Sequence, residues 1–301
     1  MQCDEKKDKS EAATIIVTLV LFLMVIFFES PALAVGAEKA SYFDNFHPIE
    51  ITGFLEERAG VRTTNDPEQK NISVLDSRLQ LEIYTYTDWV ELKYKGAVWG
   101  DGVTEKGEYE TREIWFFLRP YEFLDVKIGR QVLTWGTGDL VFINDLFPKD
   151  WQSYFIGRDK EYLKAPSDAA KMSFFTNLGN IDLVYTPQFD ADRYITGEYI
   201  SYWSEAEQRI VGQNDKVFVD KPDDWFQDEE IALRLYKNIS NYEIAFYGYF
   251  GFWKQPSSQT ESGRATFSKL NVYGASIRGL PAPLGVKIHN PADFFVTFLG
   301  C

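Results

Sequence analysis

Apolar and polar side chains alternate with a period of two along much of this chain, and this pattern constrains the fold more than any other feature. Around residues 78–86, leucine and isoleucine occupy alternate positions, and charged, amide and tyrosine side chains fill the positions between them. Successive side chains of a strand point to opposite faces, so the pattern predicts strands with one apolar and one polar face. The side chains expected on inward, polar faces are Arg78, Gln80, Glu82, Glu91, Lys93, Lys95 and Arg234.

Further alternating segments follow at intervals that are typical of an antiparallel meander. We expect strands at residues 90–98, 109–119, 124–128, 171–178, 181–186, 230–239, 242–253 and 267–278. Short turns at residues 87–88, 120, 179–180 and 238–241 alternate with long polar stretches at 101–108, 188–228 and 254–264. Outer-membrane barrels have short turns at one rim and long loops at the other. The chain is therefore predicted to be all-β, with an antiparallel up-and-down transmembrane β-barrel at residues 49–278.

A soluble β-sandwich would alternate as well, because its apolar faces pack into a core between two sheets. Alternation alone does not separate the two folds. The length of the strands, the charged residues on nearly every inward face and the unequal loops favour the barrel.

Residues 12–28 form the longest apolar run of the chain, and three lysines precede it. Small residues follow at the two positions of residues 32–34 that a signal peptidase reads. We expect residues 1–34 to be an N-terminal signal helix, cleaved after Ala34, that directs the chain to the bacterial outer membrane, with 35–48 as a short extension. Acidic residues offset the lysines, so an uncleaved anchor is the alternative. Because no second long apolar run follows, any membrane-embedded part must consist of strands.

The composition excludes several classes of function. The chain carries 45 acidic and 31 basic side chains, for a net charge of −14, so nucleic acid is not an expected partner. Its two cysteines and two histidines are too few for a thiolate or histidine metal site or for the usual histidine-dependent catalysis. Carboxylate pairs such as Glu108 and Glu110 are common in any acidic chain and do not by themselves indicate a glycosidase. We expect no catalytic residue, no metal, no cofactor and no enzymatic activity.

The most distinctive stretch is at residues 125–136, which read DVKIGRQVLTWG and lead into a loop with NDLFPKD at 144–150. Together with REIW at 112–115, it resembles the porin-like outer-membrane proteins of the DUF1302 type, which are similar in style to alginate-export and other substrate-specific porins. The resemblance covers residues 111–150. It implies an outer-membrane channel for passive passage of small hydrophilic solutes, with membrane lipid and the barrel-assembly machinery as partners. A secreted carbohydrate-binding or carbohydrate-cleaving β protein is the alternative.

Residues in and after this stretch are candidates for lining the pore or for structural contacts: Arg130, Gln131, Trp135, Asp139, Asp145, Asp150 and Arg158. By parity, Arg130 would face lipid with Val126 and Ile128, where a charge costs about 2–4 kcal/mol. We therefore expect either a bulge at Gly129 that turns Arg130 inward or a position of Arg130 at the rim. Two roles are open for Arg130: it forms a structural ion pair, or it contacts the solute directly.

Residues 136–166 are too long for a turn and too rich in aromatic residues for a free loop. We expect this segment to pack against the rest of the protein. It would either fold into the lumen and narrow the pore or rest on the rim of the barrel.

The pattern breaks at residues 279–301. Pro281, Pro283 and Pro291 interrupt strand pairing there, and the alternation is lost. We expect an irregular tail that is the truncated or frame-shifted end of a longer barrel, in which case the channel would not function.

Overall fold

The computed structural model describes residues 47–135, 145–205, 207–215, 218–240, 242–261 and 264–279, together with the backbone of residues 294–300. The expected signal helix at 1–34, its cleavage after Ala34 and most of the extension at 35–48 lie outside these residues. So does Asp139, one of the candidate pore residues.

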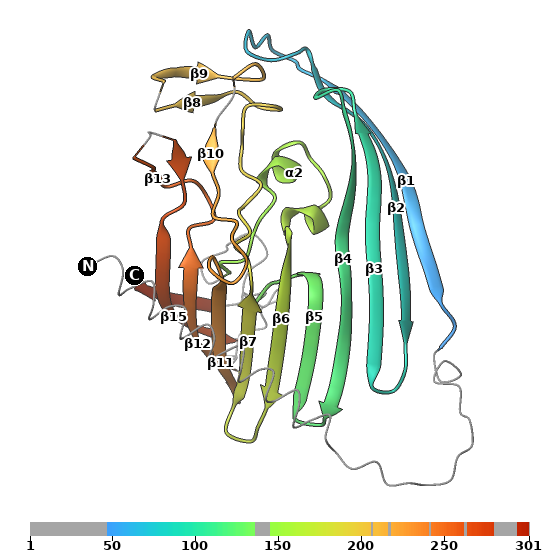
Figure 1. The fold of residues 1–301 in the computed structure, drawn as a ribbon, viewed down its shortest axis with the longest axis vertical. Coiled ribbons are helices and arrows are strands. Elements are labelled where there is room, and N and C mark those ends of the chain that lie inside the picture. The colour runs from blue at the N-terminus through green and yellow to red at the C-terminus, as the bar shows by residue number, and fades with distance from the viewer. Residues whose placement is uncertain are drawn as a thin grey trace, which may run out of the picture.

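An antiparallel sheet of eleven strands forms most of the molecule, and each strand pairs with the next sheet strand along the chain (Figure 1). The predicted all-β, antiparallel architecture is confirmed. The strands are β1 (Glu50–Val61), β2 (Ile72–Tyr86), β3 (Val90–Asp101), β4 (Lys106–Tyr121), β5 (Leu124–Val132), β6 (Pro166–Phe175), β7 (Asn180–Thr186), β11 (Glu230–Ile239), β12 (Tyr242–Phe252), β15 (Lys269–Gly279) and β16 (Phe294–Gly300).

The connections differ strongly between the two ends of the sheet. The predicted short turns join β2 to β3, β4 to β5, β6 to β7 and β11 to β12 at the lower end in Figure 1. The long connections at the other end hold the small elements α2 (Trp151–Phe155), a 3-10 helix (Lys160–Leu163), β8 (Tyr202–Ser204), β9 (Arg209–Val211), β10 (Val219–Asp220), β13 (Ser258–Gln259) and β14 (Ala265–Thr266).

The expected long polar stretch at residues 101–108 was wrong. β3 continues to Asp101 and β4 begins at Lys106, so a turn of only residues 102–105 joins them. The Asp101 carboxylate accepts hydrogen bonds from the backbone N–H groups of Val103 and Thr104, at 2.8 and 3.2 Å. This side-chain-to-backbone pattern stabilises a tight turn, and it allows the two strands to extend beyond their alternating part.

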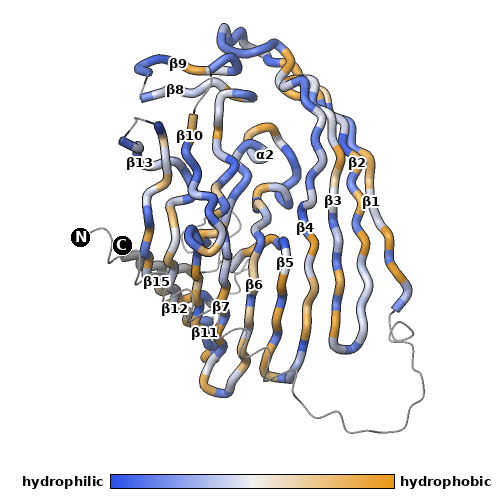
Figure 2. The backbone as a smooth tube through the Cα atoms, viewed as in Figure 1, coloured by the Kyte–Doolittle hydropathy of each residue, from blue (hydrophilic) through white to orange (hydrophobic). Residues whose placement is uncertain are grey.

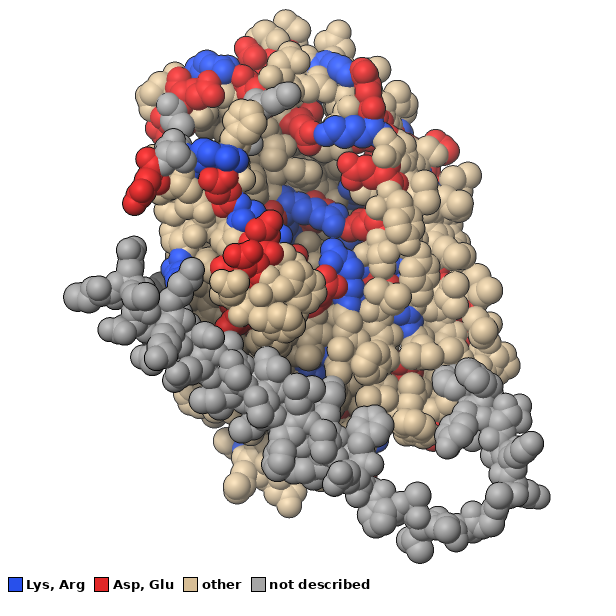
Figure 3. Space-filling model, viewed as in Figure 1, with Lys and Arg blue, Asp and Glu red and all other residues tan. Residues whose placement is uncertain are grey.

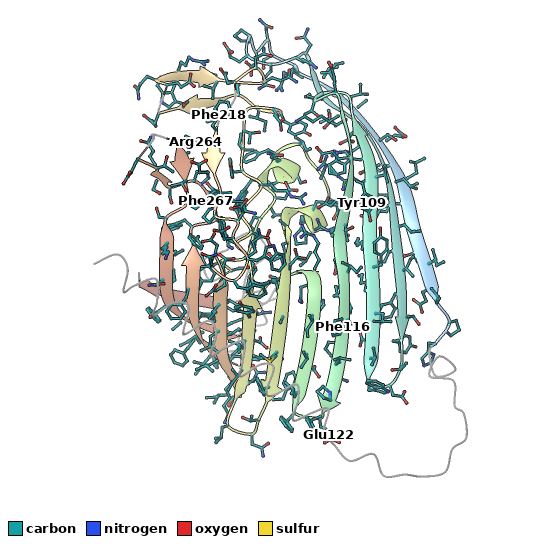
Figure 4. The ribbon with its side chains drawn as sticks, viewed as in Figure 1. Tyr109, Phe116, Glu122, Phe218, Arg264 and Phe267 are labelled. Atoms are coloured by element: carbon teal, nitrogen blue, oxygen red, sulfur yellow. The ribbon has the colours of Figure 1, made fainter. Side chains whose placement is uncertain are left out.

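Burial along the sheet is the reverse of that in a soluble protein. On β2, Leu79 is 59% exposed, whereas Arg78 and Gln80 on the opposite face are 2% and 5% exposed. Figure 2 shows hydrophobic positions alternating with polar ones along the strands, whereas the upper connections are mostly hydrophilic. Figure 4 marks Tyr109 and Phe116, two exposed aromatic residues of β4. One face of the sheet is thus apolar and exposed, and the other is polar and covered.

The covered face also holds an apolar cluster, which the expectation of a polar interior did not include. The cluster joins the connection after β5 to the inner faces of β6, β7, β11, β12 and β15. Its members are Leu133, Trp135, Phe147, Ala169, Val184, Ala232, Ala245, Tyr247, Tyr249, Leu270 and Val272. Burial of these side chains holds that connection against the sheet.

The two ends of the sheet are open. Among the described residues, β1 pairs only with β2, and β16 pairs only with β15. β16 itself corrects the expectation that residues 279–301 are wholly irregular. Pro281, Pro283 and Pro291 all precede residue 294, so a seven-residue strand forms after the last of them. Within the described ranges, no helix is long and apolar enough to cross a membrane.

Candidate functional site

The connection between β5 and β6 lies against the polar face of the N-terminal strands. We call residues 145–165 the inner segment. Tyr162 Oη donates a hydrogen bond to Gln80 Oε1 at 2.6 Å, and Glu161 forms an ion pair with Lys95. Arg112 Nη2 donates to the backbone oxygens of Glu161 and Lys164, at 2.5 and 2.8 Å. The buried polar residues of β2 to β4 therefore have partners on the inner segment as well as on neighbouring strands.

Asp150 organises the start of α2 within this segment. Its carboxylate accepts hydrogen bonds from Ser153 N at 2.7 Å and Ser153 Oγ at 2.8 Å, which is the geometry of a helix N-cap. Arg193 Nη1, from the connection after β7, lies 3.1 Å from Asp150 Oδ2. The same guanidinium forms an ion pair with Glu110 of β4. Arg193 thus links the inner segment to the wall of the sheet.

A cavity of about 590 Å³ opens where the upper ends of β3 and β4 face the inner segment and residues 193–199. We call it the charged pocket. Figure 3 shows Lys, Arg, Asp and Glu side chains gathered in the central hollow and at the upper end of this view. Four basic and four acidic residues line the charged pocket: Lys106, Arg130, Arg158, Arg193, Glu108, Glu110, Asp150 and Glu198.

Neighbouring charges and burial shift the pKa values of several groups around this pocket. Burial lowers the pKa of the Arg193 guanidinium, but the adjacent carboxylates of Glu110 and Asp150 outweigh it and leave the pKa raised. For Arg158, burial dominates and lowers the pKa, and the positive charge of Arg78 acts in the same direction. Burial also raises the pKa of the Tyr199 hydroxyl, which donates to Asp101 Oδ2 at 2.5 Å.

Three arginines surround two aromatic rings beside the charged pocket. The Arg78 guanidinium lies 5.2 Å from the Trp99 ring and 4.4 Å from the Tyr162 ring. Arg112 stacks on the Tyr162 ring at 4.8 Å and Arg158 on the Trp99 ring at 5.7 Å. Each of the three has at least one buried guanidinium nitrogen that finds no hydrogen-bond partner in the described part of the chain. Such groups can bind water or polar groups of a solute.

Three of the predicted candidates, Arg130, Asp150 and Arg158, line the charged pocket. Gln131 and Trp135 line a separate cavity of about 150 Å³, which we call the small pocket. Asp145 is buried and lines neither pocket, although it accepts a hydrogen bond at 2.8 Å from Thr134 Oγ1 of the small pocket's lining and lies 3.1 Å from Lys149 Nζ.

The residues predicted for the inward faces lie on one side of the sheet. Glu82 is 3.0 Å from Lys93 Nζ and 3.4 Å from Lys95 Nζ, and Glu91 accepts from Tyr84 Oη at 3.0 Å. Arg78 and Gln80 are buried under the inner segment. Among the C-terminal strands, on the same face, Arg234 of β11 lies 2.6 Å from Glu243 and 3.8 Å from Asp182.

The bulge that we expected at Gly129 is not present in the described strands. Gly129 has a φ of +124°, yet the register runs on from Trp115 opposite Gly129 to Ile114 opposite Arg130. Arg130 occupies the last paired position between β4 and β5, at the margin of the charged pocket. β4 continues beyond this position to Lys106, so Arg130 marks the end of the β4–β5 pairing and not the end of the sheet.

Several residues of the site were missed by reasoning from sequence. Three of them, Arg193, Lys149 and Asp192, lie in connections whose side chains do not alternate. The alternation that assigned strand residues to a face therefore predicts nothing about these three. Glu110 was noticed as part of a carboxylate pair and Arg112 as part of the REIW strand, but neither was assigned to a site. Among the described residues, no group of histidine, cysteine and carboxylate side chains is arranged to hold a metal ion.

Comparison with known proteins assigns no family to this chain: no protein-family model matches it, and no curated protein matches it significantly.

Proposed function

We propose that this chain forms the wall of a porin-like channel in an outer membrane, through which small hydrophilic solutes pass. The observation that carries the proposal is the reversed burial of the sheet, with exposed Leu79 beside buried Arg78 and Gln80. Exposed apolar side chains recur on the same face: Leu55, Leu92, Val98, Ile114, Phe116, Leu235, Phe246, Phe250 and Ile277. Such an extended apolar surface is unfavourable in water and favourable against lipid tails.

The charged pocket and the inner segment would then set which solutes pass. A segment that is held inside a barrel narrows the pore, and its charges determine selectivity. Arg158 and Arg193 attach the inner segment to Asp76 and Glu110 on the wall. Because basic and acidic groups alternate around the pocket, we expect polar solutes rather than apolar ones.

A lipid bilayer offers no hydrogen-bond partners to the free edges of β1 and β16. Each unsatisfied backbone group there costs several kcal/mol. The channel therefore requires both edges to be paired, with each other or with further strands. Cross-linking of cysteines placed at Leu55 and at Thr297 would detect pairing within one chain or between chains.

Fractionation and conductance test the proposal. We expect the protein in the membrane fraction, extracted only by detergent, and discrete conductance steps after reconstitution into planar bilayers. Recovery from the soluble periplasm without detergent would contradict the membrane location. A reconstituted protein that leaves the bilayer sealed would contradict the channel.

A carbohydrate-binding protein is the second candidate, because Trp99 and Tyr199 line the charged pocket beside Glu108 and Glu110. Aromatic faces next to carboxylates suit sugar rings. Hydrolysis is less well supported: a glycosidase needs one carboxyl group that stays protonated, whereas the ion pair with Arg193 stabilises the ionised form of Glu110. Saturable oligosaccharide binding by a detergent-free, soluble protein would favour this candidate over the channel.

A further inference from the structure

Two lysines face each other on the covered side of the sheet. Lys127 of β5 and Lys171 of β6 are direct register partners. Lys127 Nζ lies 3.9 Å from the centre of the Trp115 ring, and the residue opposite Lys171 on β7 is Val184, which is fully buried. Like charges directly opposite each other on adjacent strands destabilise a sheet unless a third group neutralises them.

No carboxylate of the described residues forms an ion pair with either lysine. Two acidic groups, Glu113 and Glu91, attract Lys127 at longer range. Glu113 is already engaged: its carboxylate accepts a hydrogen bond from Trp115 Nε1 at 2.8 Å and lies 3.8 Å from Lys93 Nζ. Within the described ranges, neither ammonium group therefore has a carboxylate partner at ion-pair distance.

The small pocket lies directly at this lysine pair. Lys127, Lys171, Gln131 and Trp135 are among its lining residues. Trp135 is 95% buried, and its Nε1–H group has no hydrogen-bond partner among the residues that the structure describes. A buried donor without a partner costs about 1–3 kcal/mol. The residues that line this cavity thus include two lysines without a carboxylate partner and a tryptophan whose N–H lacks a hydrogen-bond partner among the described residues.

We propose that Lys127, Lys171 and Trp135 bind a small oxyanion, the phosphate or carboxylate group of a solute. An oxyanion accepts hydrogen bonds from all three groups and neutralises the repulsion between the lysines. The cavity, about 150 Å³, has room for inorganic phosphate or acetate but not for a sugar ring together with its water. The site does not depend on transport, because its occupancy is measurable in protein that conducts nothing.

The test uses the full chain in detergent micelles, titrated with inorganic phosphate and, separately, with acetate at constant ionic strength. Tryptophan fluorescence and the thermal unfolding midpoint are followed together. We expect a saturable change in fluorescence and a rise of the midpoint, since a ligand that binds only the folded state stabilises it. A response to phosphate alone or to acetate alone identifies which oxyanion the site prefers.

Substitution of the lysines makes the test specific. We expect K127Q and K171Q each to bind about tenfold more weakly, the effect of one lost charge-assisted hydrogen bond, and the double variant to show no saturable response. W135F, which keeps an aromatic ring and lacks the N–H donor, should bind more weakly as well. The matched control is K237Q, because Lys237 is an exposed lysine that donates only to the backbone oxygen of Asn177.

Folding of the variants is checked without anion. Removal of one of two repelling charges should leave K171Q at least as stable as the wild type. The absence of a saturable response in the wild type, or an equal response in the double variant, would overturn the proposal. If anion binding is retained while bilayer conductance is absent, the binding site stands and the channel does not.

Discussion

Arg130 Nη1 lies 3.1 Å from Asp168 Oδ2, so these two residues form an ion pair between β5 and β6. They are also register partners on the two strands. Nε of the same guanidinium donates to the backbone oxygen of Thr111 at 2.8 Å, on the part of β4 that β5 no longer covers. Arg130 therefore joins three strands at the margin of the charged pocket, and a structural ion pair is present whether or not solute also contacts this side chain.

Arg130→Lys should lower the free energy of unfolding by about 1 kcal/mol, because lysine keeps the charge and loses the bond to Thr111. The matched control is Arg119→Lys at the exposed ion pair with Asp125, where we expect a much smaller loss because solvent screens exposed pairs. Denaturant unfolding in detergent measures both. An equal loss of unfolding free energy in the two variants would contradict the added stabilisation by the hydrogen bond from Arg130 to Thr111.

Gly129→Ala should prevent stable assembly or lower the free energy of unfolding by about 2 kcal/mol or more. A Cβ atom at this position would lie 2.3 Å from the backbone oxygen of Ile114, and the φ of +124° is unfavourable for any residue with a side chain. Gly100→Ala on β3 is the control, since a Cβ atom there meets nothing within 4 Å. Folded yield and unfolding midpoints of the two variants check the prediction.

Asp76→Asn should destabilise the fold by about 3–5 kcal/mol, the effect of leaving buried charges without a partner. The Asp76 side chain forms an ion pair with Arg58 and lies 3.6 Å from Arg158 Nη2 of the inner segment. We also expect faster proteolysis of the inner segment, because one of its anchors is lost. Glu57→Gln, which removes an exposed partner of Ser77, should change neither quantity measurably.

Leu79→Arg discriminates between lipid and water on the exposed face of the sheet. If this face contacts lipid, the substitution should cost about 2–4 kcal/mol and reduce recovery in the membrane. The control is Ile210→Arg on β9, a similarly exposed residue of the upper connections, which should be tolerated. A neutral effect of both substitutions would contradict a membrane-embedded sheet.

Asp192 should make stability depend on pH. Burial raises its pKa, although hydrogen bonds from Lys149 N at 2.7 Å and Trp151 Nε1 at 2.8 Å oppose the shift. Because the folded state binds this proton more tightly than the unfolded state, the free energy of unfolding should increase as the pH falls through the raised pKa. The full gain is reached below the unfolded value of about 3.9.

Asp192→Asn provides the reference for this dependence, because the amide does not titrate. We expect the difference in unfolding free energy between wild type and Asp192→Asn to shift in favour of the wild type as the pH is lowered from about 7 to about 4. Denaturant unfolding at several pH values measures it. A difference that stays constant with pH would exclude the shift.

Local patterns predicted the strands well and their long connections poorly. The parity of Leu79 against Arg78 predicted which face of β2 is covered, because side chains alternate whatever the strand packs against. The same reasoning named no strand at residues 50–61, where β1 lies, and it missed β16, since the prolines before residue 294 masked a short strand that begins after them. It also left two alternatives open for Arg130, because the alternation of side chains does not show where the pairing of two strands stops.

The sequence by itself determined the antiparallel strands, their turns and the assignment of charged side chains to one face, because these depend on residues that are near one another in the chain. Only the tertiary structure decided where the connections lie. Arg193 meets Glu110, 83 positions away, and Tyr162 meets Gln80, 82 positions away. Such contacts arise when a curved sheet brings distant segments onto its covered face, and no local pattern of side chains specifies that curvature.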